Sequence, residues 1–208
     1  MKNILCFGDS NTYGYVPQTG NRYERDVRWT GVVQRELGDG YYVIEEGLNG
    51  RTTVWEDPIE EFKSGKDYLL PCLASHKPLD LVVIMLGTND LKVRFSLSAL
   101  DIAGGMENLL RKILKSDCFR ENEKPQILLM APVPLGNMTE FFDMFGPDAN
   151  KKSVDIVPLY KNLAQTYHTH FLEAGSIIRV SNEDGLHYSP ESHNTLGQAV
   201  AKIVADVV

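Results

Sequence analysis

Short apolar runs alternate along the chain with longer segments in which apolar residues recur every three or four positions. Short continuous apolar runs are typical of buried strands, and the three-to-four spacing is typical of amphipathic helices. Their alternation favours parallel strands joined by crossover helices. The pattern predicts strands at residues 3–7, 42–46, 79–86 and 126–130, with a short last strand near Phe171 or, as an alternative, at 176–180.

The helical segments carry start and stop signals. Gly38 follows the first of them, and Pro190 opens the last one after the capping residue Ser189. Gly104 and Gly105 lie inside the third helix, where missing side chains would allow close packing on the sheet. The predicted helices cover residues 29–37, 68–75, 97–114, 154–166 and a final segment from residue 190.

These elements predict an α/β fold. The run at 79–86 is the most continuously apolar, which suits a central strand covered on both faces. The 208 residues contain no repeat, low-complexity tract or linker-like stretch. We therefore expect a single three-layer α/β/α domain spanning residues 1–208, with a doubly wound parallel sheet of about five strands.

Candidate functional residues follow the predicted strands at their carboxyl ends. Ser10 follows the first strand, Gly50 the second and Asn89 the third. Asp184 and His187 follow the last strand. Ligands of doubly wound sheets bind outside these strand ends, so we expect all five residues to lie on one rim of the sheet.

Ser10, His187 and Asp184 are the residue types of a nucleophilic triad. A serine hydroxyl is a weak nucleophile, and it needs an imidazole to accept its proton and a carboxylate to orient that imidazole. Ser10 is the candidate nucleophile, His187 the candidate base and Asp184 the candidate orienting group. The structural alternatives are a serine that only caps the following turn and an Asp184-Gly185 turn pair, which is compatible with the triad.

Acyl transfer also needs donors aimed at the developing oxyanion. The Asn89 side-chain amide and the backbone N–H groups of Gly50 and Ser10 are the candidates. The alternatives are a helix-capping role for Asn89 and a left-handed turn at Gly50. No Gly-x-Ser-x-Gly sequence surrounds any serine, which argues against an ordinary α/β-hydrolase.

Charge, hydropathy and cysteine count limit the kinds of partner and the cellular compartment that we expect. The 28 acidic and 21 basic side chains give a formal net charge of −7, which disfavours nucleic acid and anionic membranes. The apolar start, residues 1–7, is too short for a signal peptide, and the longest apolar run, 81–86, cannot span a bilayer. Three cysteines without metal-like spacing favour a reduced, cytoplasmic protein without a disulfide. We expect a small-molecule substrate, no metal and no cofactor.

Four ordered blocks resemble those of the SGNH (GDSL-type) hydrolases, a family of esterases and lipases. The resemblance spans nearly the whole chain and implies a flavodoxin-like fold. It also implies a triad of Ser10, His187 and Asp184, with an oxyanion hole formed by Ser10, Gly50 and Asn89. The blocks are Gly8-Asp9-Ser10, Gly50, Gly87-Thr88-Asn89-Asp90 and Asp184-x-x-His187.

The stretches 4–10, 26–31, 45–48, 51–53 and 85–90 resemble the arylesterase/acyltransferase branch, also called perhydrolases. This resemblance implies hydrolysis of short acyl esters, acyl transfer to alcohols or peroxide, and closed homo-oligomers, octamers in the best-known member. It also places residues 9, 11 and 13, which are Asp9, Asn11 and Tyr13, near the substrate.

The chain departs from that branch at the predicted site. Asn11 stands where leucine is usual, Gly50 where alanine is usual, and Tyr13 and Tyr15 where tryptophans are usual. The more polar side chains bear on how well the site excludes water, and hence on whether acyl transfer competes with hydrolysis.

Residues 133–147 are rich in apolar side chains without helical regularity. So much apolar surface on a loop needs a cover. The two interpretations are a lid over the pocket of its own subunit and a subunit interface that narrows a neighbour's site.

The sequence predicts a serine esterase of short-chain acyl esters, with acetyl esters first. The enzymatic alternative is a carbohydrate O-acetylesterase, since the same blocks serve sugar deacetylation. The non-enzymatic alternative is a flavodoxin-like module whose 8–14 loop binds a phosphate or nucleotide, although that loop carries Asp9 and no basic residue.

Overall fold

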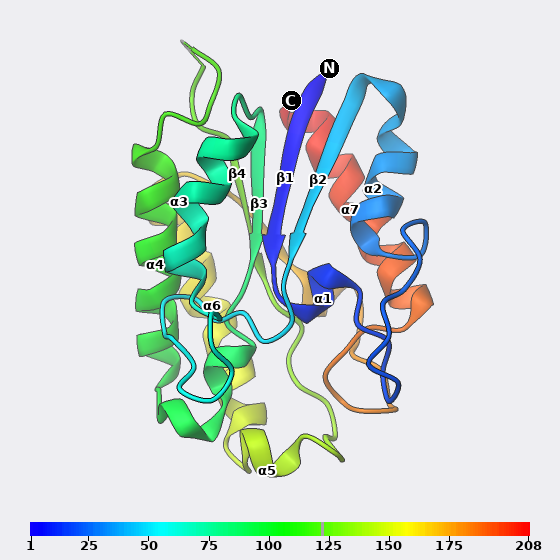
Figure 1. Cartoon of the computed structure of the whole chain (residues 1–208), viewed down its shortest axis with the longest axis vertical. Helices are drawn as coiled ribbons and strands as arrows, with labels where there is room; N and C mark the ends of the chain where they lie inside the picture. The colour runs from blue at the N-terminus through cyan, green and yellow to red at the C-terminus, as the bar shows by residue number, and fades with distance from the viewer. Residues whose placement is uncertain (122) are drawn as a thin grey trace.

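Five parallel strands form one central sheet in the computed structural model, which describes residues 1–121 and 123–208 (Figure 1). Their order across the sheet is β2-β1-β3-β4-β5, which confirms the predicted parallel sheet. The order in which the chain adds strands reverses between β1 and β3, and doubly wound folds bind ligands at such a switch point. The strands are β1 (Lys2–Gly8), β2 (Tyr41–Gly47), β3 (Leu81–Met85), β4 (Ile127–Ala131) and β5 (His170–Glu173).

The fifth strand takes one of its two predicted positions. β5 contains Phe171 and pairs with β4, and Glu173 lies opposite Ala131, the last residue of β4. Residues beyond Glu173 therefore have no strand to pair with, and Ala174–Ser176 form a 3₁₀ turn. The alternative strand at 176–180 is wrong for this reason.

Helices cover both faces of the sheet, which confirms the three-layer arrangement. α2 and α7 pack together on one face, and α3, α4 and α6 cover the other (Figure 1). Among the described residues, none of the helices is both long enough and apolar enough to cross a bilayer. The helices are α2 (Trp29–Leu37), α3 (Gly65–His76), α4 (Ala99–Lys115), α6 (Ala149–Tyr167) and α7 (Pro190–Val207).

α6 begins well before the predicted helix at 154–166. Its first five residues include Asn150 and Ser153, whose polarity hides the start of the helix from a hydropathy pattern. Asn150 donates to the carbonyls of Leu135 (3.0 Å) and Gly136 (2.6 Å), and Ser153 Oγ accepts the Leu135 N–H (3.0 Å). These hydrogen bonds fix the segment after β4 to the helix.

Several one-turn helices were not predicted, because a single turn contains no repeat of the hydrophobic pattern. Three of them follow the carboxyl ends of strands and therefore help to build the edge of the sheet at which the candidate functional residues lie. These are α1 (Ser10–Tyr13) after β1, the 3₁₀ turn Asn89–Leu91 after β3, and α5 (Phe142–Phe145) after β4.

A buried carboxylate ties the loops at this edge together. Asp90 is fully buried and accepts the backbone N–H of Thr53 (3.0 Å) and its hydroxyl. Thr53 in turn lies against Gly105 of α4, where an added Cβ would overlap Oγ1 of the threonine. Gly104 faces open space. The close packing predicted for the glycine pair therefore applies to Gly105 alone, and it is made against a loop.

Gly105→Ala should destabilise the protein, because the new methyl group overlaps a threonine that Asp90 holds in place. We expect the free energy of unfolding to fall by about 1–3 kcal/mol, the usual effect of overpacking. Gly104→Ala is the matched control, since it adds a methyl group to open space in the same helix and should stabilise the protein by up to about 1 kcal/mol. Urea denaturation measures both changes, and equal effects would contradict the packing.

Asp90→Asn should flatten the pH dependence of stability. Burial raises the pKa of Asp90 to about 7 in the folded protein, whereas an aspartate in an unfolded chain ionises near pH ~3.9. Between these values the folded state holds more protons, so stability falls as the pH rises. The asparagine keeps an acceptor for Thr53 and does not titrate. The free energy of unfolding of the variant, relative to that of wild type, should therefore rise from about pH 4 to pH 7. Denaturation across that range tests this; a constant difference would show that Asp90 does not titrate there.

Candidate active site

Ser10 lies in the first turn after β1, where α1 begins. Asp9 caps this helix through Oδ1, which accepts the N–H of Asn11 (3.0 Å). Gly8 has no room for a side chain, since a Cβ there would stand 2.8 Å from the Cβ of Thr12. The capping role considered for Ser10 therefore belongs to Asp9, and the Ser10 hydroxyl is left for another partner.

The loop before α7 brings an imidazole to that hydroxyl. His187 Nε2 lies 3.0 Å from Ser10 Oγ, and His187 Nδ1 lies 2.7 Å from Asp184 Oδ2. The other Asp184 oxygen accepts the backbone N–H groups of Leu186 and His187, each at 2.9 Å. Ser10, His187 and Asp184 are all buried. Residues from opposite ends of the chain thus form one series of hydrogen bonds.

Asp184 is held in its ionised form. Burial raises the pKa of its carboxyl group, but His187 and the two backbone donors outweigh burial and lower the pKa below its ordinary value. Gly185 adopts a left-handed conformation (φ 71°), which turns the chain after Asp184. The Asp184-Gly185 turn and the contact with His187 therefore occur together.

Two aromatic rings and an amide hold the His187 loop. Tyr15 stacks on the His187 ring with centroids 4.1 Å apart, and Phe141 meets the ring edge-on at 5.7 Å. Asn11 Nδ2 donates to the carbonyl of Leu186 (3.3 Å). The imidazole is thus packed by groups from two other loops.

The three predicted oxyanion donors lie beside one cavity. Ser10 is the first residue of α1, so its N–H has no partner within the helix. Gly50 is left-handed (φ 81°), as expected of a turn after β2. The Asn89 amide donates to the carbonyl of Arg51 (3.1 Å), which leaves its second N–H for another acceptor. Ser10, Gly50 and Asn89 all line the cavity.

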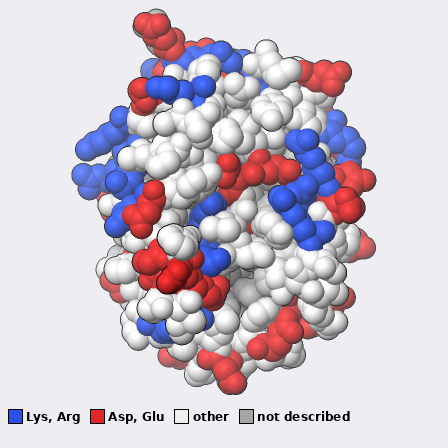
Figure 2. All heavy atoms as spheres, in the orientation of Figure 1, with Lys and Arg blue, Asp and Glu red and all other residues white. Residues whose placement is uncertain are grey.

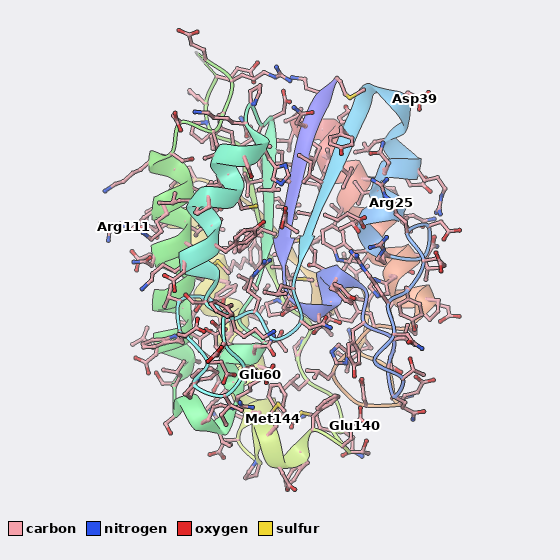
Figure 3. All side chains as sticks on the ribbon, viewed as in Figure 1. Arg25, Asp39, Glu60, Arg111, Glu140 and Met144 are labelled. Atoms are coloured by element: carbon pink, nitrogen blue, oxygen red, sulfur yellow. The ribbon has the colours of Figure 1, made fainter. Side chains whose placement is uncertain are left out.

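This cavity measures about 130 Å³. Its wall is apolar where Phe141, Met144 and Phe145 contribute and charged where Glu60 and Lys92 contribute. Figure 3 shows Glu60 and Met144 at the same end of the molecule, beyond the carboxyl ends of the strands. The complete lining comprises Ser10, Tyr15, Asn49, Gly50, Glu60, Asn89, Lys92, Phe141, Met144, Phe145, Leu186 and His187.

The three residues expected near the substrate do not belong to the cavity wall formed by the described residues. Asp9 is buried at the cap of α1, and burial raises its pKa to about 6. Asn11 is buried as well. The ring of Tyr13 lies under the guanidinium group of Arg22 (4.3 Å). Tyr15, the second tyrosine singled out by the sequence, lines the cavity instead.

A sequence pattern points to some of the other lining residues and not to the rest. Phe141, Met144 and Phe145 belong to the apolar 133–147 segment, which here packs over the pocket of its own chain. The excess of apolar side chains was therefore a usable signal. Glu60 and Lys92 belong to no motif, and their side chains reach the cavity only through the folding of two loops.

One group of potential metal ligands occurs among the described residues. Glu46, Cys72 and His76 each place a ligand atom within 4.8 Å of the others. His76 Nε2 and Glu46 Oε1 already share a hydrogen bond of 2.8 Å. Burial, together with Glu46, raises the pKa of Cys72 to about 12, which disfavours the thiolate that metals bind. His76 and Glu46 thus already satisfy each other, and none of the three residues lines the Ser10 cavity.

The fold and the sequence have clear relatives. The profile of the GDSL-like Lipase/Acylhydrolase family matches residues 6–194. An aryl esterase of M. smegmatis is 40% identical, with a TM-score of 0.94 and coverage of 100% of both chains. A carbohydrate acetylesterase from Sinorhizobium meliloti is 41% identical, with the same TM-score of 0.94 and coverage of 100% of both chains. No curated protein matches the chain significantly. The chain therefore belongs to the GDSL-like lipase/acylhydrolase family of carboxylic ester hydrolases, and within it to the arylesterase branch.

Proposed function

We propose that the protein is a serine esterase that hydrolyses short-chain acyl esters through an acyl-enzyme on Ser10, with acetyl esters as its main substrates. The observation that carries this proposal is the 3.0 Å contact between Ser10 Oγ and His187 Nε2, with Asp184 at 2.7 Å on the other ring nitrogen. A weakly nucleophilic hydroxyl becomes reactive when an oriented imidazole accepts its proton.

The reaction takes two steps at the same atoms. In the first, Ser10 Oγ attacks the ester carbonyl carbon while His187 Nε2 accepts the hydroxyl proton, and the imidazolium then protonates the leaving alcohol. In the second, His187 accepts a proton from water as that water attacks the acyl-enzyme, and the acid leaves when Ser10 regains its proton. The N–H groups of Ser10, Gly50 and Asn89 stabilise the oxyanion in both steps.

The surroundings of His187 fit its proposed change of charge. Asp184 is ionised and lies against Nδ1, so it orients the ring and stabilises the imidazolium. Tyr15 stacks on the imidazole with the ring centroids 4.1 Å apart, which helps to hold the plane of the His187 ring.

The cavity size supports a short acyl group. Its volume of about 130 Å³ is small beside the roughly 300–1,000 Å³ of ordinary ligand pockets. Phe141, Met144 and Phe145 close the apolar part of the wall. These side chains bound the space next to the Ser10 hydroxyl, an arrangement that favours a small acyl group.

Of the two alternative functions, one is supported by a similar protein and the other is disfavoured by the structure. Carbohydrate O-acetylesterase activity is the second candidate, supported by the 41% identity to an acetylesterase of that kind. A phosphate-binding loop is disfavoured, because the Asp9 carboxylate already occupies the Asn11 N–H at the start of α1. Acyl transfer to alcohols or peroxide and assembly into a homo-oligomer remain predictions.

Ser10→Ala should lower kcat/KM for p-nitrophenyl acetate by at least about 10⁴-fold, because it removes the attacking atom. The side chain makes no structural cap, so the circular dichroism spectrum and the melting temperature should stay close to those of wild type. Ser176→Ala, at an exposed serine, is the control and should keep full activity. Substantial hydrolysis by a folded Ser10→Ala variant would rule out the assignment.

Met144→Ala should widen the acyl specificity, because it opens the apolar wall of the cavity. We expect the ratio of kcat/KM for p-nitrophenyl butyrate to that for the acetate to rise by about tenfold, the usual effect of one or two methylenes in a pocket. Phe142→Ala is the matched control, since this residue of α5 is exposed and does not line the cavity. An unchanged ratio in Met144→Ala would place the acyl chain elsewhere.

A further inference from the structure

Four charged side chains form a cluster at one side of the cavity. We call Asp57, Glu60, Lys92 and Arg94 the charge cluster. Lys92 is buried, and its ammonium group binds Glu60 Oε1 (2.7 Å) and Asp57 Oδ2 (3.5 Å). Arg94 binds the same carboxylates, at 3.0 Å to Asp57 and 3.5 Å to Glu60. Two carboxylates and two cations leave the cluster without net charge, so it does not repel an oxyanion beside it.

The two carboxylates of the charge cluster differ: backbone N–H groups hold Asp57 in place, whereas Glu60 is partly exposed to solvent. Asp57 is buried and also accepts the N–H groups of Ile59 (2.9 Å) and Glu60 (3.1 Å). Burial raises the pKa of Asp57, but these donors and the two cations outweigh burial and lower it. The Glu60 side chain keeps 35% of its surface exposed and lines the cavity. Figure 2 shows charged atoms of both signs beside a hollow in the lower half of this face.

One carboxylate oxygen of Glu60 has no donor. Lys92 and Arg94 both bind Oε1, and no donor from the described chain binds Oε2. Oε2 lies over Gly50, since a Cβ added at Gly50 would stand 2.8 Å from it. Gly50 is one of the proposed oxyanion donors, so a free acceptor lies close to the position of the reacting carbonyl.

We propose that Glu60 Oε2 accepts a hydrogen bond from a free hydroxyl on the alcohol part of the ester, so that the enzyme prefers acetyl esters of polyols. This inference rests on the proposed esterase function. The apolar wall at Phe141 and Met144 takes the acyl methyl group, and the Glu60 side takes the hydroxylated alcohol. Lys92 and Arg94 hold the carboxylate in place, so little ordering is needed when the hydroxyl binds.

If the alcohol part of the ester carries no free hydroxyl, it displaces water from Glu60 and gives no hydrogen bond in return. Closed sites built for a hydroxyl reject analogues that lack it by about 10⁴–10⁵-fold. Glu60 is one-third exposed, so water still reaches it after binding. We therefore expect a smaller discrimination, of about tenfold.

Glycerol monoacetate and propyl acetate make a matched pair of substrates, because they share the acyl group and the three-carbon chain of the alcohol. Wild type should hydrolyse the monoacetate with a kcat/KM about tenfold higher. Glu60→Ala should bring this ratio close to one, mainly through a lower rate on the monoacetate. Glu61→Ala, at an exposed acid outside the cavity wall, is the control and should keep the wild-type ratio.

The outcomes separate this inference from the proposed function. A wild-type ratio near one, or a ratio that Glu60→Ala leaves unchanged, would overturn the role of Glu60 while the esterase function stands. If wild type hydrolyses none of the three esters (glycerol monoacetate, propyl acetate and p-nitrophenyl acetate), both are overturned. If Glu60→Ala does not fold, Glu60→Gln decides: its carbonyl oxygen must accept from Lys92 and Arg94, so an amide donor replaces the Oε2 acceptor, and the ratio should fall in the same direction.

Discussion

The contact between Ser10 and His187 is the constraint on which the rest of the site depends. It joins the first turn after β1 to the loop before α7, so the two ends of the chain must meet within 3.0 Å. Ser10 follows the central strand β1, whereas the segment that carries His187 starts from β5 at the edge of the sheet and returns to β1 before α7 packs against α2. The Asn11 bond to the Leu186 carbonyl and the Tyr15 stack then fix the separation.

Three buried aspartates near this contact have different environments and therefore different tasks. Asp184 faces an imidazole, and its pKa is lowered. Asp9 and Asp90 lack such a partner, and burial raises the pKa of Asp9 to about 6 and that of Asp90 to about 7. Asp9 caps α1, and Asp90 binds Thr53. Only Asp184 is thus suited to stabilise an imidazolium, and the other two hold the loops that present Ser10 and Asn89.

The sequence predicts elements that repeat and fails for those that do not. The five strands and the long helices follow from periodicity, and the placing of Ser10, Gly50, Asn89 and His187 follows from the rule that parallel strands end on one edge. The turns α1 and α5 hold too few residues to show a period. Glu60 reaches the cavity through a loop whose path depends on the ion pairs of Asp57 with Lys92 and Arg94, which lie far from it along the chain and which no local pattern encodes.

The proposed mechanism requires that its neighbours activate the hydroxyl of Ser10, which then attacks the substrate. Reaction of the folded protein with a fluorophosphonate, followed by peptide mapping with mass spectrometry, tests it most directly. We expect one adduct, on the peptide that contains Ser10, and loss of labelling when the protein is unfolded. An adduct on another residue, or none in a preparation that hydrolyses esters, would contradict it.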